Sequence, residues 1–341
     1  MEYVDPRRKL ESDAAAAIKV RLKALFDLFD ADPAVTEVNI NGVTGVFVTR
    51  KGKREEVVGL IFEEHVLAAA LRAVASSMGQ ECQAETETGV VTGKLPGYRF
   101  SGALYPMAAC GTSISIRKHN PKVLTIDDYV ASGTLDQETA DLLIEMVRDG
   151  KTILVGGGTD SGKTTFLNML SRLIPEDARV GSIEDTRELK LLVKNWYPLE
   201  YNKQKGYDAT LCVETMMRSS PDRIILGEMR DEVAAAFIEA ANTGHEGSMA
   251  TVHANTARAT LERVEMLTLR AGLGWSIEAI GKAIAIAINV VVHLKKLRTG
   301  ERVVTEIIEI TGYDYAAREY RTNTLYERPK VAPELESLLP A

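Results

Sequence analysis

The chain has 341 residues and a formal net charge of −7, and its apolar and charged fractions, 45% and 26%, are ordinary for a globular protein. This length predicts two domains, each large enough to bury its own core. The acidic total argues against a dedicated nucleic-acid binder, which normally carries a basic excess, although a local basic patch could be hidden in it.

Cysteine usage and hydropathy indicate a cytoplasmic protein. Cys82, Cys110 and Cys212 lie far apart without metal-ligand spacing, which favours small buried side chains in a reducing compartment. The polar start of the chain lacks the apolar core of a signal peptide. The longest strongly apolar run, residues 283–292, is about half of what spans a bilayer. We therefore expect any membrane contact to be peripheral or made through a partner.

The first 119 residues predict an antiparallel α+β domain with helices on a sheet. Apolar residues recur at helical spacing before the stop at Asp32-Pro33, and an Asn41-Gly42 turn joins two alternating segments into a hairpin. The predicted helices are 13–29 and 63–78, and the predicted strands are 35–40, 45–49, 57–61, 89–92, 98–105 and 111–117.

Residues 120–135 predict a linker to a second domain over 136–341. Pro121 keeps its predecessor out of the helical region, and Thr125 with Asp128 forms a helix-start capping box. A helix over 136–147 then opens the second domain.

A phosphate loop lies at the centre of the second domain. Residues 157–164, GGTDSGKT, fit the pattern G-x-x-x-x-G-K-[ST], with an apolar strand-like run before them and a helical pattern after them. Backbone N–H groups of such a loop bind phosphate, the lysine reaches the β- and γ-phosphates, and the Thr164 hydroxyl binds Mg²⁺. The predicted nucleotide-contacting residues here are Gly157, Gly158, Thr159, Asp160, Ser161, Gly162, Lys163, Thr164 and Thr165.

Strands and helices alternate after the loop, which predicts a mostly parallel sheet covered on both faces. The further strands are 179–183, 223–226 and 248–252, and the helices are 211–217 and 231–241. Later come helices 258–271 and 276–287, strands 290–297 and 302–310, and a loose tail.

Three strand ends carry candidate catalytic groups, because ligands bind beyond the carboxyl ends of parallel strands. Glu184 and Asp185 could hold the attacking water or accept its proton, and Glu228 could orient Mg²⁺. Glu228 follows Gly227, which occupies the position where a phosphate-loop ATPase usually has Asp. Each acid could instead be a helix cap or a surface group.

Two histidines and two arginines have both a structural and a functional interpretation. His245, in the glycine-flanked loop 242–247, and His253, at a strand end, are either structural donors or sensors of the γ-phosphate. Arg99 and Arg117, on strands near the linker, are either surface residues or charges that reach the terminal phosphate.

The ordered motifs resemble the four boxes of the secretion traffic ATPases. They are the loop 157–164, the acidic stretch 183–189, PDRIILGEMR at 221–230, and NTGHEGS at 242–248 continuing through T-x-H-A-N at 251–255. VNING at 38–42 and the stretch from Arg99 to SIRK at 115–118 extend the resemblance over nearly the whole chain. This superfamily serves type II and type IV secretion, conjugation and pilus assembly.

The resemblance implies a hexameric ring with ATP bound between the two domains. It assigns Glu184 to the acidic box, Glu228 to the Walker B position and His253 to the histidine box, and it gives Arg99 and Arg117 contacts with the γ-phosphate. Thr164, Glu228 and Glu184 are then the expected Mg²⁺ ligands.

Two departures from the family pattern bear on the prediction. Asp160 replaces a small residue or glycine, and we expect its side chain to point outward. A four-cysteine zinc module is missing from the sequence, which favours conjugation and type IV secretion members. Residues 258–269 and His293-Leu294 also look like tight-adherence pilus ATPases.

The sequence therefore predicts a hexameric, Mg²⁺-dependent ATPase that powers a type IV secretion or conjugation apparatus at the cytoplasmic face of the inner membrane. Lys163 holds phosphate, Glu184 is the leading candidate for general base, and inner-membrane secretion or pilus platform proteins are the expected partners. The alternatives are a pilus assembly or retraction motor, a DNA-translocating motor, and a nucleotide-gated scaffold. Sequence-specific nucleic-acid binding is not expected.

Overall fold

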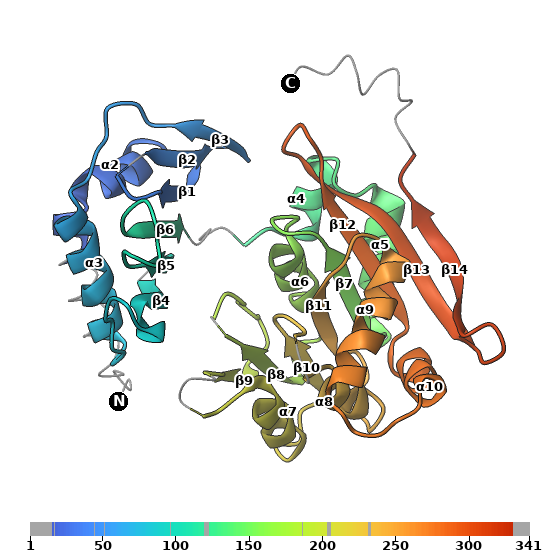
Figure 1. Ribbon diagram of the computed structural model, residues 1–341. Coiled ribbons are helices and arrows are strands. Elements are labelled where there is room, and N and C mark those ends of the chain that lie inside the picture. Colours follow the sequence, from blue (N-terminus) through green and yellow to red (C-terminus); the bar gives the residue numbers. More distant parts are fainter. Residues whose placement is uncertain are drawn as a thin grey trace. The chain divides into compact units, whose positions relative to one another are not determined.

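The computed structural model describes residues 16, 18–43, 45–50, 52–95, 97–118, 123–185, 187–202, 206–230 and 233–329. The chain divides into two compact units, residues 1–122 and 123–341 (Figure 1). The predicted linker 120–135 crosses this division, because helix α4, Ile126–Ala131, belongs to the second unit.

The first unit is an antiparallel sheet with helices packed on one face. The sheet has the strand order β3-β2-β1-β6-β5-β4. A single apolar core joins the sheet to helices α2 and α3 and includes Phe29, Leu71 and Phe100. The elements are α2 Lys23–Ala31, β1 Val35–Ile40, β2 Val46–Arg50, β3 Lys53–Glu56, α3 Glu64–Ser77, the short 3₁₀ helix η1 Glu87–Gly89, β4 Val90–Leu95, β5 Tyr98–Ala103 and β6 Ser113–Lys118.

Two predicted elements of this unit differ from the structure. The strand predicted over 57–61 is wrong: the return strand is β3, which starts at Lys53 opposite Arg50. Its four residues are all exposed, so an edge strand without an apolar face gave no hydrophobic signal. The helix predicted over 13–29 begins outside the described residues, and α2 continues to Ala31.

The second unit is an eight-stranded, mostly parallel sheet with the order β14-β13-β12-β7-β11-β10-β8-β9. The strands from β12 to β9 run parallel, and β13 and β14 add antiparallel pairs at one edge. Its strands are β7 Ile153–Gly157, β8 Arg179–Glu184, β9 Asn195–Glu200, β10 Arg223–Leu226, β11 Met249–His253, β12 Val290–Lys296, β13 Arg302–Asp314 and β14 Glu319–Glu327. Its helices are α4, α5 Gln137–Arg148, α6 Lys163–Ser171, α7 Ala209–Met217, α8 Val233–Ala241, α9 Ala257–Arg270 and α10 Ile277–Ala287.

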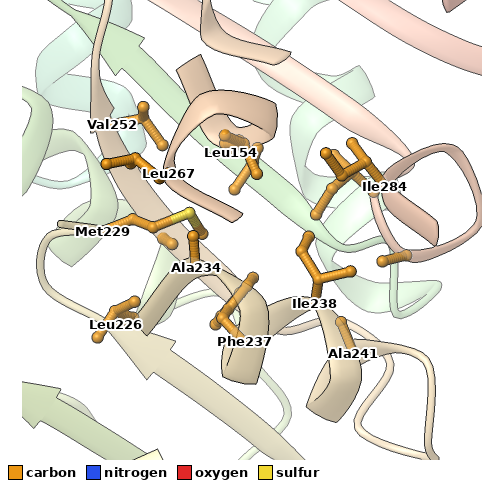
Figure 2. Packing of buried hydrophobic residues seen from close by; sticks show 14 of the residues in the cluster. Leu154, Leu226, Met229, Ala234, Phe237, Ile238, Ala241, Val252, Leu267 and Ile284 are labelled. Atoms are coloured by element: carbon orange, nitrogen blue, oxygen red, sulfur yellow. The ribbon is translucent and has the colours of Figure 1, made fainter. Parts of the chain in front are cut away.

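Each face of this sheet buries its own core. Alternate residues of β7 point to opposite faces, so Leu154 packs with helices α7 to α10 while Ile153 and Val155 pack with α4 to α6. Figure 2 shows the first of these cores, where Ile238 of α8 lies beside Ile284 of α10 and Phe237 belongs to the same cluster. Burying one such side chain stabilises the fold by about 2 kcal/mol. The two cores fix the strand ends from which the candidate site is built.

Strands β9 and β14 were not predicted. Both lie at edges of the sheet, and most of their side chains are at least partly exposed. Such strands show weak hydrophobic periodicity, and their existence depends on the neighbouring strand that they pair with. The capping box at α4 is confirmed: the Thr125 hydroxyl accepts the Asp128 N–H, and the Asp128 carboxylate accepts the Thr125 N–H.

Candidate nucleotide site

The phosphate loop connects β7 to α6. Gly162 caps the amino end of α6 in the left-handed conformation, with φ +90°. Asp160 also has a positive φ, +60°. Aspartate is one of the few residues besides glycine that enter this region, which explains why the slot accepts Asp or Gly.

Two glycines at the start of the loop are required by close packing. A Cβ built on Gly156 would lie 2.2 Å from the Thr260 Oγ1 of α9, and one on Gly157 would lie 2.6 Å from the Leu294 carbonyl oxygen of β12. Gly158 differs, because no described neighbouring atom lies within 4 Å of a Cβ built there. The end of β7 is therefore packed tightly, whereas the described atoms leave space around Gly158 in the loop that follows.

Lys163 connects the loop to two other strand ends. It is buried, and its Nζ donates to the Gly158 carbonyl oxygen over 2.8 Å and lies 3.3 Å from the His253 Nδ1. The His253 Nε2 lies 3.0 Å from the Glu228 Oε1, and the other oxygen of Glu228 accepts from Arg230. Residues from α6, β11 and the end of β10 thus form one continuous polar chain.

The charge state of His253 fits this chain. Burial lowers the pKa of its imidazole, the Lys163 ammonium lowers it further, and the Glu228 carboxylate opposes both. A neutral ring then accepts a hydrogen bond from the Lys163 ammonium at Nδ1 and donates one from Nε2 to Glu228.

Glu184, at the end of β8, is buried with 3% exposure. Its Oε1 accepts the N–H groups of Glu188 and Leu189 over 2.9 and 3.1 Å. Its Oε2 is buried without a hydrogen-bond partner among the described residues. Burial raises the pKa of this carboxyl to about 7, against the opposing effect of the two N–H groups. A carboxylate with a pKa near neutrality is suited to accept a proton.

Gly227 makes room for Glu184. A Cβ on Gly227 would lie 3.1 Å from the Glu184 Cγ, which is a tight contact. A side chain at this position would require the Glu184 side chain of the neighbouring strand to shift by a few tenths of an ångström.

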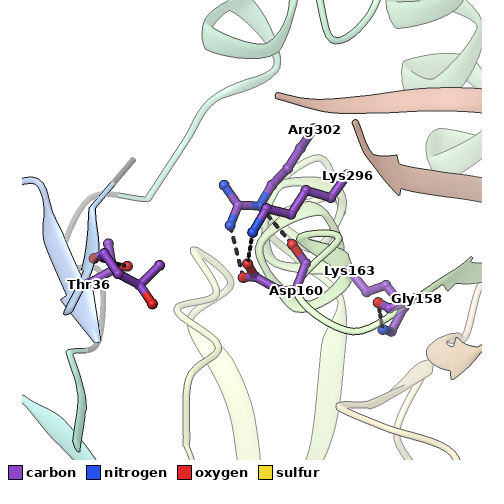
Figure 3. A network of polar contacts seen from close by, with 7 residues as sticks. Thr36, Gly158, Asp160, Lys163, Lys296 and Arg302 are labelled. Carbon is purple, nitrogen blue, oxygen red and sulfur yellow. Dashed lines mark hydrogen bonds and ion pairs between the residues drawn. The ribbon is translucent and has the colours of Figure 1, made fainter. Parts of the chain in front are cut away.

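Asp160 is held by two cations rather than left in solvent. Its carboxylate accepts from Lys296 over 2.6 Å and from Arg302 over 2.9 Å, as Figure 3 shows. Sequence reasoning missed both cations because they lie more than 130 residues along the chain. The turn between β12 and β13 was predicted, but its position over the loop depends on tertiary structure.

Arg99 and Arg117 lie in the first unit as direct register partners on β5 and β6. Their neighbours Phe100 and Ile116 are fully buried in the helix-covered core, so the two arginines lie on the other face of the sheet. Glu37 of β1 is opposite Arg117 in the same row.

The structure does not place His245 beside the loop. Its buried ring contacts the Pro221 carbonyl oxygen, with Nδ1 at 2.9 Å. Pro221 precedes β10 and His245 precedes β11, so both lie at the amino edge of the parallel strands. The phosphate loop follows β7 and therefore lies at the carboxyl edge. Of the two interpretations of His245, the geometry supports the structural one.

Groups at the loop fit phosphate and a hard cation. Ser161 is 1% exposed, and its Oγ is buried without a partner among the described residues. Lys163 supplies a positive charge beside it. Thr164 and Glu228 offer hydroxyl and carboxylate oxygens, which are the ligand types that Mg²⁺ prefers together with nucleotide phosphates.

The comparisons with known proteins agree with this geometry. Residues 35–321 match the family of Type II/IV secretion system proteins. The chain belongs to this family. It is 33% identical over 290 residues to the conjugal transfer protein TrbB of Rhizobium radiobacter, which covers 83% of this chain and 85% of that protein. It is 31% identical over 314 residues to the type IV secretion system protein VirB11 of Brucella suis, which covers 82% and 86% of the two chains.

The same fold occurs in a solved ATPase. The X-ray structure of the Yersinia pseudotuberculosis ATPase DotB superimposes with a TM-score of 0.61 at 18% identity, covering 91% of this chain and 82% of that one. The family and the phosphate loop together make this protein an ATPase of the type IV secretion and conjugation class. Among the helices that the structure describes, none is both long and apolar enough to cross a membrane.

Proposed function

We propose that this protein hydrolyses ATP in the presence of Mg²⁺ at the loop 157–164 and uses the energy to drive transfer through a type IV secretion or conjugation apparatus. The observation that carries the proposal is the polar chain from Lys163 through His253 to Glu228, which joins the phosphate loop to the ends of two neighbouring strands. A binding loop alone needs no such connection to an acidic group.

In this proposal the loop N–H groups and Lys163 hold the β- and γ-phosphates. Glu184 accepts the proton of the attacking water, because its carboxyl has a pKa near neutrality and its Oε2 has no hydrogen-bond partner among the described residues. Mg²⁺, when bound by Thr164 and Glu228, would neutralise charge on the phosphates. His253 orients the Glu228 carboxylate and contacts the lysine that binds phosphate.

We further propose that Arg99 and Arg117 stabilise the charge that develops on the terminal phosphate. The two arginines are register partners on adjacent strands, so their guanidinium groups extend from the same face of the sheet. A guanidinium group is well suited to bind phosphate. Assembly as a homohexamer at the cytoplasmic face of the inner membrane, with secretion-apparatus proteins as partners, belongs to the same proposal and is supported by the similarity to TrbB and VirB11.

Steady-state ATP hydrolysis by the full chain tests the proposal. Lys163→Ala should abolish nucleotide binding and turnover, and Glu184→Gln should lower kcat by at least about a hundredfold while nucleotide still binds. Full ATP turnover by Lys163→Ala would overturn the site assignment. Nucleotide binding without hydrolysis in the assembled wild-type protein would instead favour a nucleotide-gated scaffold.

The arginine assignment needs its own comparison. Arg99→Ala with Arg117→Ala should lower ATP turnover much more than it lowers ADP affinity, because ADP lacks the γ-phosphate. Arg72→Ala, which removes an exposed arginine from α3 of the same unit, is the matched control. Equal losses in the double variant and the control would argue against a role at the phosphate.

A further inference from the structure

A carboxylate inside a phosphate loop is electrostatically unfavourable, and here it is matched by two cations from a distant hairpin. Lys296 Nζ lies 2.6 Å from the Asp160 Oδ2. The Arg302 guanidinium donates to the Asp160 Oδ1 over 2.9 Å and to the Asp160 carbonyl oxygen over 3.0 Å. Figure 3 shows both side chains converging on Asp160 from the same side.

The hairpin presents these cations in a fixed position. Lys296 at the end of β12 and Arg302 at the start of β13 are register partners, and β12 pairs directly with β7, which leads into the loop. The Arg302 carbonyl oxygen accepts from the buried Thr134 hydroxyl over 3.1 Å. A Cβ on Gly162 would lie 3.0 Å from the Arg302 Cδ, so the arginine stem lies over the amino end of α6.

The charges in this group do not cancel. Burial alone would raise the pKa of Asp160, but the hydrogen bonds and charges of Lys296 and Arg302 together outweigh it, and the pKa lies below its ordinary value. Asp160 is therefore ionised at neutral pH. One negative and two positive groups give Asp160, Lys296 and Arg302 together a net charge of +1, beside the charge of Lys163.

We propose that Lys296 and Arg302 are positioning residues of the nucleotide site, which neutralise Asp160 and leave the phosphate loop with a net positive charge toward a nucleoside triphosphate. The proposal rests on nucleotide binding at this loop. Negative charge close to a phosphate weakens its binding, and positive charge strengthens it. The affinity for the nucleotide should therefore follow the net charge of Asp160, Lys296 and Arg302 together.

Equilibrium binding of a fluorescent ADP analogue to four forms of the full chain tests this. Wild type has a net charge of +1 at the group, and Asp160→Asn has +2. The double cation variant, Lys296→Met with Arg302→Met, has −1. The triple variant, which adds Asp160→Asn to these two changes, has 0. Asparagine is used because it tolerates the positive φ of this position.

The expected order of affinity is Asp160→Asn, wild type, triple variant, double cation variant. The double cation variant should bind at least about tenfold more weakly than wild type, and adding Asp160→Asn to it should recover most of that loss. High salt should reduce the differences, because these groups are partly exposed.

If the ion pairs of Asp160 with Lys296 and Arg302 only held the loop in shape, the result would be different. Asp160→Asn would then weaken binding, and the triple variant would be no better than the double variant; either outcome overturns the proposal. Lys296→Met alone, with a net charge of 0, should match the triple variant, so the prediction remains testable if the double variant fails to fold.

Two controls separate this inference from the proposed function. Arg318→Met with Arg321→Met removes two cations from ion pairs with Glu278 of α10 and with Asp314 at the far end of β13, and should leave the affinity unchanged. Lys163→Ala reports on the nucleotide site itself. If Lys163→Ala still binds the analogue, the proposed function fails; if it loses binding and the charge series shows no trend, only the present inference fails.

Discussion

The buried carboxyl of Glu184 should make the second unit less stable as the pH rises. Its pKa is raised by burial from 4.5 to about 7, so the folded state holds a proton that the unfolded state releases. The corresponding stabilisation is fully present below pH 4.5 and is lost as the pH rises through 7. Between pH 5 and pH 8 this loss amounts to about 2.5 kcal/mol, at about 1.4 kcal/mol per pH unit between the two pKa values.

Glu184→Gln removes this titration while keeping an oxygen for the N–H groups of Glu188 and Leu189. The new amide N–H₂ takes the place of Oε2, for which the described part of the chain offers no partner, and this costs about 1–3 kcal/mol at every pH. The free energy of unfolding of the variant relative to wild type should therefore increase by about 2.5 kcal/mol from pH 5 to pH 8.

Urea unfolding followed by tryptophan fluorescence measures this difference. The chain has two tryptophans, Trp196 and Trp275, and both belong to the second unit, so the signal reports on the unit that contains Glu184. Glu145→Gln, an exposed carboxyl on α5, is the control and should show no such trend. A difference between Glu184→Gln and wild type that stays constant across the pH range would refute the reasoning.

Three further changes test the packing around the site. Gly156→Ala should cost about 1–3 kcal/mol of unfolding free energy, because its Cβ would overlap Thr260, and Thr260→Ala in the same chain should recover part of this; no recovery would contradict the contact. Phe237→Ala, at a fully buried position, should cost about 3–5 kcal/mol in the same assay, and a cost near zero would contradict its place in the core. Asp128→Ala removes half of the capping box at Thr125 and should cost about 1 kcal/mol, measured by thermal unfolding; an unchanged midpoint would show that the box does not stabilise α4.

Features read from local sequence were predicted well. The loop motif with its flanking strand and helix, the parallel strands that end at Glu184, Glu228 and His253, and the capping box at Thr125 all depend on short stretches of chain. Burial on both faces makes such strands continuously apolar, and loop chemistry is set by a few consecutive residues, so both leave a clear signal.

The edge strands and the position of His245 were predicted less well. Strand β3 is exposed along its whole length, and β9 and β14 have mostly partly exposed side chains, because an edge strand is defined by its neighbour rather than by its own periodicity. His245 had both a structural and a functional interpretation, and spacing along the chain did not decide between them. Because it precedes a parallel strand, it lies at the opposite edge of the sheet from residues that follow one.

The sequence by itself determined that this chain carries a phosphate loop with acidic and histidine-bearing strand ends, because each of these is written in consecutive residues. Only the tertiary structure decided how they are used. It brought Lys296 and Arg302 onto Asp160, linked Lys163 to Glu228 through His253, and packed Gly227 closely against the buried Glu184. Such contacts depend on distances across the sheet, and spacing along the chain carries no record of them.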